Sequence, residues 1–420
     1  MVKNFPIVKW AIGANIYEVN IRQYTAAGTF EAFSFHILRL YEMGVSILWL
    51  MPITPISIEK RQGTLGSYYA CSNYTEINPE FGDVESFKKL VDIAHLLGMK
   101  IIIDWVANHT GYDHHWTKEH PDWYLKDEHG NFTEKNGWQD VIDLDYNNQA
   151  MQDAMIEAMQ YWVKECKIDG FRCDMAHLVP IDFWIKARKR CDAIKPLFWL
   201  AECENNEYYK AFDVTYAWNW MHALDKYFKQ EITLKNVWAI LDEYAKYSYG
   251  GIKLFFTSNH DENSWNGTEY EKYGKAAKVL AVFTCTWNGI SLIYSGQENP
   301  NYKRLNFFEK DRIEWNKIPE LHYFYKRLLF IRKSKAVIEG GTFIIPTQNE
   351  NVIAFLRRKS NDVVLVLLNL SNEDKIKITV NHVWFKGIFQ NLFSEFLFSF
   401  DTTAQFELSA YEYRIYNRVI

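Results

Sequence analysis

The feature that most constrains this chain is a rhythm of eight short apolar runs separated by longer stretches of helical periodicity. Strands that alternate with helices predict right-handed β-α-β units in a parallel sheet. Eight such units are the number that closes a (β/α)₈ TIM barrel. The apolar runs begin near Ile16, Ser46, Lys100, Gly170, Phe198, Asp213, Lys253 and Ser291. The helices are expected at residues 31–43, 83–97, 148–166, 181–194, 234–247 and 268–284.

Two parts of the chain leave this rhythm. Residues 105–147, here called the excursion, follow the third strand and are far longer than the usual connection of about 2 to 6 residues. After about residue 335, β-like runs follow one another without a helix, which predicts an antiparallel β-sandwich. Its strands are expected at residues 352–356, 363–370, 375–380 and 406–416. The predicted domains are a catalytic barrel at 1–104 and 148–335, a short inserted domain at 105–147 and a sandwich at 336–420.

Several predicted barrel strands end in a carboxylic acid. Asp104, Asp174, Glu202 and Asp261 each follow the apolar run of a different strand. Because the carboxyl ends of barrel strands carry the active site, acids at these positions favour catalysis. Capping of the following helices would explain one such acid well, but four of them poorly.

Composition narrows the class of ligand. A formal charge of −5 argues against a protein that coats nucleic acid or an anionic membrane. Aromatic residues make up 17% of the chain, and their flat, amphipathic rings suit sugars as well as protein cores. No stretch approaches the roughly 20 apolar residues of a membrane span.

The cysteines bear on the compartment. There are six in 420 residues, which is sparse, and Cys173 and Cys203 lie within apolar, strand-like runs where free buried thiols are common. The start of the chain has no apolar stretch followed by a cleavage site. We therefore expect reduced thiols and a cytoplasmic protein. The alternative is an exported protein whose leader is absent from this chain.

Four segments, in the correct order on successive strand ends, resemble the signature regions of the α-amylase family, glycoside hydrolase family 13. They are residues 104–109, 170–174, 200–202 and 256–261. The resemblance spans essentially the whole chain. It implies that the excursion is the family's domain B and the sandwich its domain C. It also implies a retaining hydrolase that cleaves α-1,4-glucosidic bonds of starch or maltooligosaccharides.

The resemblance implies a role for each acid. Asp174 would be the nucleophile that forms a covalent glycosyl-enzyme, Glu202 the general acid and base, and Asp261 the stabiliser of the oxocarbenium-like transition state. Arg172 lies two residues before Asp174 on the same side of its strand, so we expect it to lower the pKa of Asp174. Apolar neighbours and the charge of Asp174 are expected to raise the pKa of Glu202.

Other residues of these motifs are implied to surround the sugar. Asp104 and Arg172 are placed there, and His109 and His260 would hydrogen-bond its hydroxyl groups. Tyr68 matches the aromatic residue that stacks under the reacting sugar, although Tyr69 fits that place equally well.

No metal is expected to be required. The histidines of the excursion lack the Cys partners and regular spacing of a zinc site. Many members of the family hold one Ca²⁺ and carry Lys-His shortly after the nucleophile, where this chain has His177 and Leu178. Calcium remains the alternative, through the oxygen atoms of Asn108, Asp143 and Asp145.

Within the family, an exo-acting α-glucosidase or a transglycosylase is the alternative activity. Met175, directly after the nucleophile, is neither the Val common in α-1,6-acting members nor the Ala or Thr common in α-1,4-acting ones. A non-catalytic glucan-binding barrel is the alternative from another class of protein. Such barrels lose catalytic carboxylates, whereas this chain keeps Asp174, Glu202 and Asp261.

Overall fold

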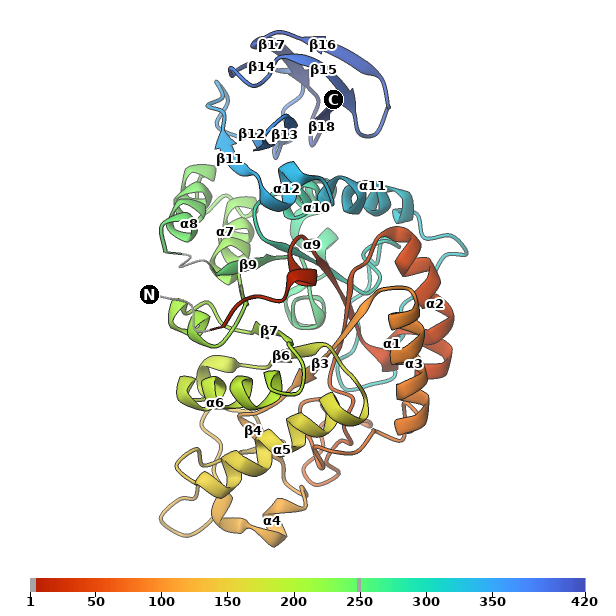
Figure 1. The fold of residues 1–420 in the computed structure, drawn as a ribbon, viewed down its shortest axis with the longest axis vertical. Helices are drawn as coiled ribbons and strands as arrows, with labels where there is room; N and C mark the ends of the chain where they lie inside the picture. Colours follow the sequence, from red (N-terminus) through yellow and green to blue (C-terminus); the bar gives the residue numbers. More distant parts are fainter. Residues whose placement is uncertain (1–4, 248–250, 420) are drawn as a thin grey trace.

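The structure is a computed structural model that describes residues 5–247 and 251–419. Its centre is built from β1 (Asn15–Val19), β2 (Ile47–Leu50), β3 (Lys100–Trp105), β6 (Gly170–Cys173), β7 (Phe198–Ala201), β8 (Val214–Tyr216), β9 (Ile252–Phe255) and β10 (Ile290–Tyr294). These eight parallel strands close into a barrel in the order β1-β10-β9-β8-β7-β6-β3-β2 (Figure 1). The predicted (β/α)₈ barrel is confirmed, and each strand begins within one residue of its expected start.

The barrel is surrounded by helices, most of which the periodicity predicted. They are α2 (Phe30–Met43), α3 (Val84–Leu96), α5 (Gln149–Glu165), α6 (Ile181–Asp192), α8 (Leu234–Tyr247), α9 (Glu269–Tyr273) and α10 (Ala277–Thr286). The start of α3 has a capping box, in which Asp83 accepts a hydrogen bond from the Ser86 N–H at 2.8 Å. The single helix expected at 268–284 is instead divided into α9 and α10, because Gly274 takes a φ of 53° between them.

Three further helices are not among those predicted from the periodicity of the sequence. They are α7 (Trp218–Phe228), α11 (His322–Arg332) and the single turn α1 (Ile21–Tyr24). The residue before α7 is Ala217, which has no side chain that can cap a helix. Tertiary packing stabilises α7 in place of a cap, since its residues Trp220, Met221 and Leu224 are buried against the barrel.

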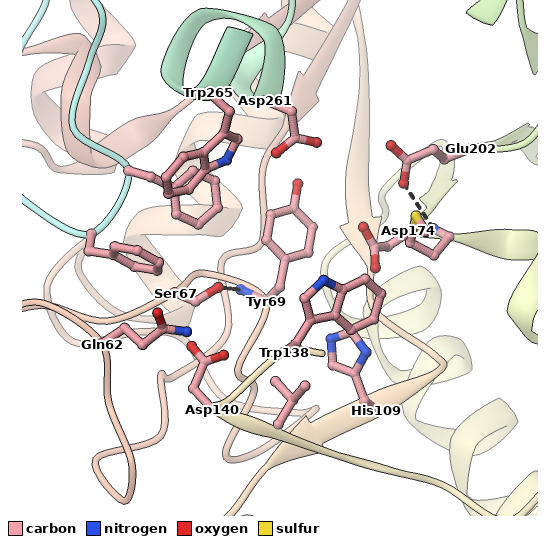
Figure 2. A pocket seen from close by; sticks show the side chains of 14 residues that line it. Gln62, Ser67, Tyr69, His109, Trp138, Asp140, Asp174, Glu202, Asp261 and Trp265 are labelled. Carbon is pink, nitrogen blue, oxygen red and sulfur yellow. Dashed lines mark hydrogen bonds between the residues drawn. The ribbon is translucent and has the colours of Figure 1, made fainter. Parts of the chain in front are cut away.

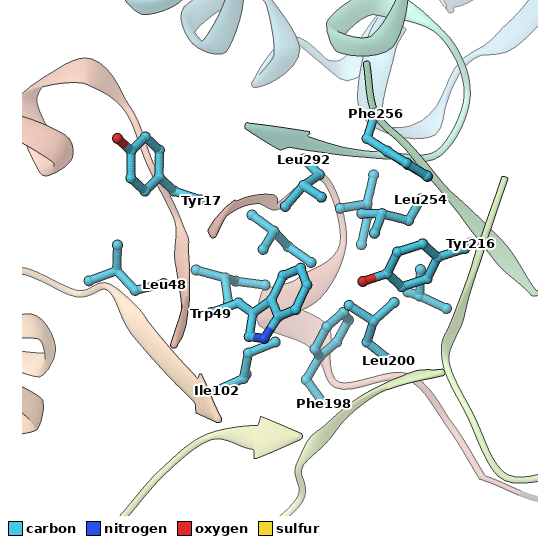
Figure 3. Close-up of a cluster of buried hydrophobic side chains, with 14 of the residues drawn as sticks. Tyr17, Leu48, Trp49, Ile102, Phe198, Leu200, Tyr216, Leu254, Phe256 and Leu292 are labelled. Carbon is cyan, nitrogen blue, oxygen red and sulfur yellow. The ribbon is translucent and has the colours of Figure 1, made fainter. Parts of the chain in front are cut away.

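Large apolar side chains fill the barrel interior (Figure 3). Trp49 of β2 lies among them and is fully buried, and its Nε1 donates a hydrogen bond to Asp104 Oδ2 at 3.2 Å. The Arg172 guanidinium carbon lies 4.9 Å from the centre of the Trp49 ring. Trp49 of the apolar core therefore contacts both Asp104 and Arg172, the charged residues at the carboxyl end of the barrel.

The excursion forms a small unit of its own at the lower end of the molecule (Figure 1). Its antiparallel strands β4 (His109–Gly111) and β5 (Val141–Asp143) pair with each other, and the turn α4 (Trp116–Glu119) lies between them in the sequence. Trp116 and Trp123 are 6% and 7% exposed, and their rings meet edge to face at 4.9 Å. These two tryptophans therefore form part of the packed interior of the excursion.

The C-terminal part lies at the opposite end of the molecule from the excursion (Figure 1). Its strands are β11 (Gly341–Ile344), β12 (Val352–Lys359), β13 (Asp362–Asn369), β14 (Ile376–Asn381), β15 (Gly387–Asn391), β16 (Leu397–Phe400), β17 (Thr403–Leu408) and β18 (Tyr413–Arg418). They form a six-stranded and a two-stranded antiparallel sheet that share an apolar core. The run expected at 406–416 is two strands, because Tyr411 turns the chain with a φ of 54°.

The junction between the barrel and these sheets is α12 (Lys335–Glu339). The buried side chain of Arg357, on β12, donates hydrogen bonds to the Val337 and Gly340 carbonyl oxygens at 2.7 and 2.8 Å.

All six cysteines are free and buried. Within the described ranges, no helix is both long and apolar enough to cross a bilayer.

Candidate active site

The carboxyl ends of the barrel strands bring the four predicted acids together. Asp104 lies near the end of β3, Asp174 and Glu202 directly follow β6 and β7, and Asp261 lies in the segment after β9. Asp174, Glu202 and Asp261 line a cavity of about 270 Å³ (Figure 2). The side chain of Asp104 is fully buried beneath them.

Arg172, whose side chain is fully buried, joins three of these acids. Its Nη1 donates to Asp104 Oδ1 at 2.8 Å and to Asp174 Oδ1 at 2.9 Å. Its Nη2 forms an ion pair with Glu202 Oε1 at 2.7 Å. One guanidinium thus serves three carboxylates, which leaves the cluster with excess negative charge.

Burial and the Arg172 cation act in opposite directions on the pKa of Asp174. Burial raises it well above its ordinary value, and although Arg172 lowers it, the charges of Glu202 and Asp104 raise it further. Arg172 therefore lowers the pKa of Asp174 as expected, but burial and the neighbouring carboxylates outweigh its effect, so the net shift is upward. The reason is that desolvation penalises the anion, and the single cation is shared. Burial likewise raises the pKa of Asp104 to about 6.

His260 lies in a chain of polar groups at the same carboxyl rim of the barrel. Its Nδ1 is 2.5 Å from Glu18 Oε1, and its Nε2 is 2.7 Å from the Tyr69 hydroxyl and 3.3 Å from Asp261 Oδ2. Burial lowers the pKa of His260, but the charges of Asp261 and Glu18 outweigh this effect and raise it to about 9. The ring is therefore a cation near neutral pH. The sequence analysis missed Glu18, whose signal is an acid within the apolar run of β1.

Tyr69, rather than Tyr68, faces the cavity. Tyr68 is 1% exposed and packs under the Arg22 guanidinium, whose carbon lies 4.2 Å from its ring centre. The Tyr69 hydroxyl donates to Asp104 Oδ2 at 3.1 Å, and its ring stacks on His260 at 5.5 Å. The structure therefore corrects the choice of Tyr68, because neighbouring residues of this loop point in different directions and only one reaches the cavity.

His109 also lines the cavity and is 3% exposed. Burial lowers its pKa to about 4, so the ring is neutral near pH 7. The side-chain amide of Asn108 lies 3.3 Å from His109 Nδ1 and orients the ring. Beyond the predicted residues, the sequence analysis missed several side chains of the wall, namely Gln62, Ser67, Trp138, Asp140, Phe307 and Phe308.

Met175 holds Glu202 in place through its backbone. It takes a left-handed conformation with a φ of 39°, which is uncommon for a residue with a side chain. Its N–H donates to Glu202 Oε2 at 2.9 Å. Strained backbone of this kind collects at functional sites.

The three candidate calcium ligands do not form a calcium site in this arrangement. Asp143 Oδ1 is buried without a hydrogen-bond partner in the described part of the chain, which would suit a cation. Asp145 Oδ1, however, accepts two hydrogen bonds from Asn147 at 2.9 Å. Among the described residues, no three His, Cys, Asp or Glu side chains are grouped to hold a metal. Calcium usually takes 6 to 8 oxygen ligands, so these residues do not fit it.

Acidic groups gathered around one buried cation at the carboxyl rim of an eight-stranded barrel define a TIM-barrel enzyme with acid–base chemistry. The sequence matches the family described as "Alpha amylase, catalytic domain" over residues 23–128 and 119–320. The chain belongs to this alpha-amylase family.

Individual proteins are similar over most of the chain. The crystal structure of the maltogenic alpha-amylase AmyB from Thermotoga neapolitana has a TM-score of 0.89 and 32% identity, covering 98% of this chain and 100% of that one. An alpha-amylase from Lactobacillus plantarum has a TM-score of 0.89 and 29% identity over the same shares. Alpha-amylase 2 of Dictyoglomus thermophilum is 28% identical over 84% of this chain. The chain spans 64% of the length of that curated protein.

Proposed function

We propose that this protein is a retaining glycoside hydrolase that cleaves α-1,4-glucosidic bonds of starch-derived chains or maltooligosaccharides. The observation that carries the proposal is the placement of Asp174, Glu202 and Asp261 around one cavity, with Arg172 beneath. Glycoside cleavage needs an acid for the leaving oxygen and a carboxylate for the anomeric carbon. The names of similar proteins, alpha-amylase and cyclomaltodextrinase among them, support an α-glucan substrate.

The proposed mechanism uses Asp174 and Glu202 in two steps. Protonated Glu202 gives its proton to the glycosidic oxygen while Asp174 attacks the anomeric carbon, so that the C–O bond breaks and a glycosyl-enzyme forms. Glu202 then takes a proton from water, and the hydroxide released attacks the anomeric carbon and frees Asp174. Arg172 holds Asp174 Oδ1 at 2.9 Å, which leaves Oδ2 for the attack.

The remaining polar groups would bind the reacting sugar. Asp261 faces the cavity beside the His260 cation, where a carboxylate stabilises the positive charge of the transition state. Neutral His109 can donate or accept a hydrogen bond from a sugar hydroxyl. Tyr69, held by Asp104 and His260, presents its ring to the cavity as the stacking surface.

The test is the product profile. Amylose or maltooligosaccharides should give shorter maltooligosaccharides, released first as α-anomers. Release of glucose alone from p-nitrophenyl α-glucoside, with amylose untouched, would show an exo-acting α-glucosidase. Preferential cleavage of pullulan at α-1,6 bonds, or products longer than the substrate, would likewise contradict hydrolysis of α-1,4 bonds.

The raised pKa of Asp174 predicts the pH dependence. Asp174 must be ionised to attack, and its pKa lies well above the ordinary value of 3.8. We therefore expect kcat/KM to fall as the pH is lowered through this raised pKa, at a pH above 3.8. Because the charge of Asp104 contributes to the rise, Asp104→Asn should move this acid limb to lower pH. An acid limb that stays in place in this variant would contradict the assignment.

We also propose that the activity needs no metal. Of the candidate ligands Asn108, Asp143 and Asp145, the last is used in the turn before α5, where its Oδ1 accepts two hydrogen bonds from Asn147. Incubation with EDTA should therefore leave both the turnover and the melting temperature unchanged. A fall of many degrees that calcium reverses would contradict this prediction.

We further propose that the protein works in the cytoplasm. Free, buried cysteines suit a reducing compartment. Asn108 begins an Asn-x-Thr sequence, and a glycan on this residue, which is 8% exposed beside His109, would disrupt the cavity. A thiol titration of the denatured protein should count six. A count of two or fewer would exclude a chain with reduced cysteines.

A further inference from the structure

The carboxylate of Asp261 is placed mainly by its backbone. Its side chain is 39% exposed, and its contact with His260 Nε2 is long, at 3.3 Å. Asp261 ends the segment that follows β9, here called the β9 loop (residues 256–261). A single π-helical turn, Glu262–Asn266, begins directly after it and carries Trp265 to the same cavity (Figure 2). Turns of this kind occur often at functional sites, so the contacts that fix the β9 loop bear on catalysis.

A buried carboxylate of α9 holds the start of the β9 loop. Glu269 is 5% exposed, and its Oε2 accepts hydrogen bonds from Thr257 Oγ1 at 2.9 Å and from Gln297 Nε2 at 2.6 Å. Gln297, which follows β10, also donates to Thr257 Oγ1 at 2.9 Å. Burial raises the pKa of Glu269 to about 7, so an acid at this place costs stability near neutral pH. Glu269 has no part in the proposed catalytic steps, and its contacts with the β9 loop account for it.

A lysine of the same helix holds the other end of the loop. Lys272 lies three residues after Glu269, on the same face of α9, and its side chain is 7% exposed. Its Nζ forms ion pairs with Glu262 Oε2 at 2.5 Å and with Asp225 Oδ1, on α7, at 3.2 Å. Glu262 directly follows Asp261, and its side chain is 3% exposed. The helix α9 therefore contacts this part of the chain on both sides of Asp261.

The helix α9 is itself short and has defined ends. It begins at a capping box, in which Thr268 Oγ1 accepts from the Glu271 N–H at 3.1 Å and Glu271 Oε2 accepts from the Thr268 N–H at 2.7 Å. It ends at Gly274, whose φ of 53° separates it from α10. Because of this break, α9 is anchored to the β9 loop and to α7 instead of forming the first turns of α10.

We infer that Glu269 and Lys272 are positioning residues for Asp261: they hold the chain at Thr257 and at Glu262, so that the Asp261 carboxylate faces the reacting sugar. The inference rests on the proposed function, in which Asp261 stabilises the positive charge of the transition state. None of the five residues of α9, all of them described, lines the cavity. They act through geometry, since a displacement of about 1 Å at a reacting group can cost about 10²-fold in rate.

Substitutions of Glu269 test the first anchor. Glu269→Ala should lower the kcat for maltotetraose by about 10²-fold while the KM changes by less than about threefold, because Asp261 acts mainly in the transition state. Glu269→Gln should keep most of the turnover, since both hydrogen bonds go to one oxygen, which the amide retains. Rates are compared per folded molecule, well below the melting temperature of each variant.

A double-mutant cycle shows whether the effect passes through Asp261. In the Asp261→Asn background, where the charge to be positioned is already lost, Glu269→Ala should cost less than about threefold in kcat. The second anchor is measured independently and does not require Glu269→Ala to fold. In a Glu262→Gln background, which leaves no buried carboxylate of the β9 segment without its cation, Lys272→Met should lower the kcat about tenfold.

The control on the same helix is Glu271→Gln. Glu271 pairs with Arg304 at 3.0 Å, but its side chain is 47% exposed, and its other bond is to the Thr268 N–H of the capping box. The amide keeps an oxygen for this N–H, and an exposed ion pair contributes little to stability. We therefore expect Glu271→Gln to leave both the kcat and the KM unchanged.

The outcomes separate the inference from the proposed function. If the wild type does not cleave maltotetraose, or if Asp261→Asn leaves the turnover unchanged, the proposed function fails. If the wild type cleaves it and Asp261→Asn is impaired, but Glu269→Ala has the same effect on kcat in both backgrounds or no effect in either, the positioning role is wrong. An equal loss of kcat in Glu269→Gln and Glu269→Ala would also contradict it, because the amide keeps the acceptor oxygen.

Discussion

Glu202→Gln should lower the kcat for maltooligosaccharides by about 10² to 10⁴-fold while substrate binding changes little. The amide cannot donate a proton to the glycosidic oxygen, and this proton matters mainly in the transition state. The amide keeps the oxygen that accepts the Met175 N–H at 2.9 Å but loses the ion pair with Arg172 at 2.7 Å, so the kcat is compared per folded molecule. Asp174→Asn should lower the kcat comparably, since it removes the nucleophile, and the two losses should not multiply.

A substrate with a good leaving group distinguishes the two acids. α-Glucosyl fluoride needs no protonation, so Glu202→Gln should still form the glycosyl-enzyme, and added azide should release it as the α-glycosyl azide. Asp174→Asn has no nucleophile and should not give this product. Formation of the α-azide by Asp174→Asn, or first release of the β-anomer by the wild type, would overturn both the roles and the retaining mechanism.

Arg172→Met should lower the free energy of unfolding by about 3 to 5 kcal/mol near neutral pH. The side chain of Arg172 is fully buried, and its removal leaves Asp104, Asp174 and Glu202 close together without their common cation. Turnover should also be lost, since Asp174 would no longer be held for attack. Chemical denaturation at several pH values measures the first effect.

The loss of stability in Arg172→Met should depend on pH, and the direction of this dependence identifies its cause. Without the cation, the pKa values of Asp104 and Asp174 rise further, so these two groups become neutral as the pH falls and their repulsion disappears. The destabilisation by Arg172→Met should therefore shrink at lower pH. A destabilisation that is independent of pH would indicate lost packing on Trp49 instead of lost charge neutralisation.

Arg188→Met is the matched control. Arg188 is another buried arginine, and it pairs with Asp213 at 3.0 Å and donates to the Ala211 carbonyl oxygen at 2.8 Å, away from the cavity. We expect this variant to lose stability but to keep its turnover per folded molecule. Equal loss of turnover in the two variants would mean that Arg172 acts only through stability.

The sequence by itself determined the barrel and the positions of its acids. The eight strands follow from apolar runs that are local in the chain, and their starts agree with the structure within one residue. Asp104, Asp174 and Glu202 could be expected to meet because each lies at a strand end, and parallel strands of a barrel end on one rim. This part of the site depends on topology alone.

Tertiary structure decided the rest, because the deciding quantities are distances and burial between segments far apart in the chain. Whether Tyr68 or Tyr69 faces the cavity depends on the packing of Arg22 on one of them. The charge of His260 depends on Glu18, 242 residues away. The pKa of Asp174 depends on how many carboxylates share one guanidinium in the absence of water, a balance that the spacing of residues along a strand does not contain.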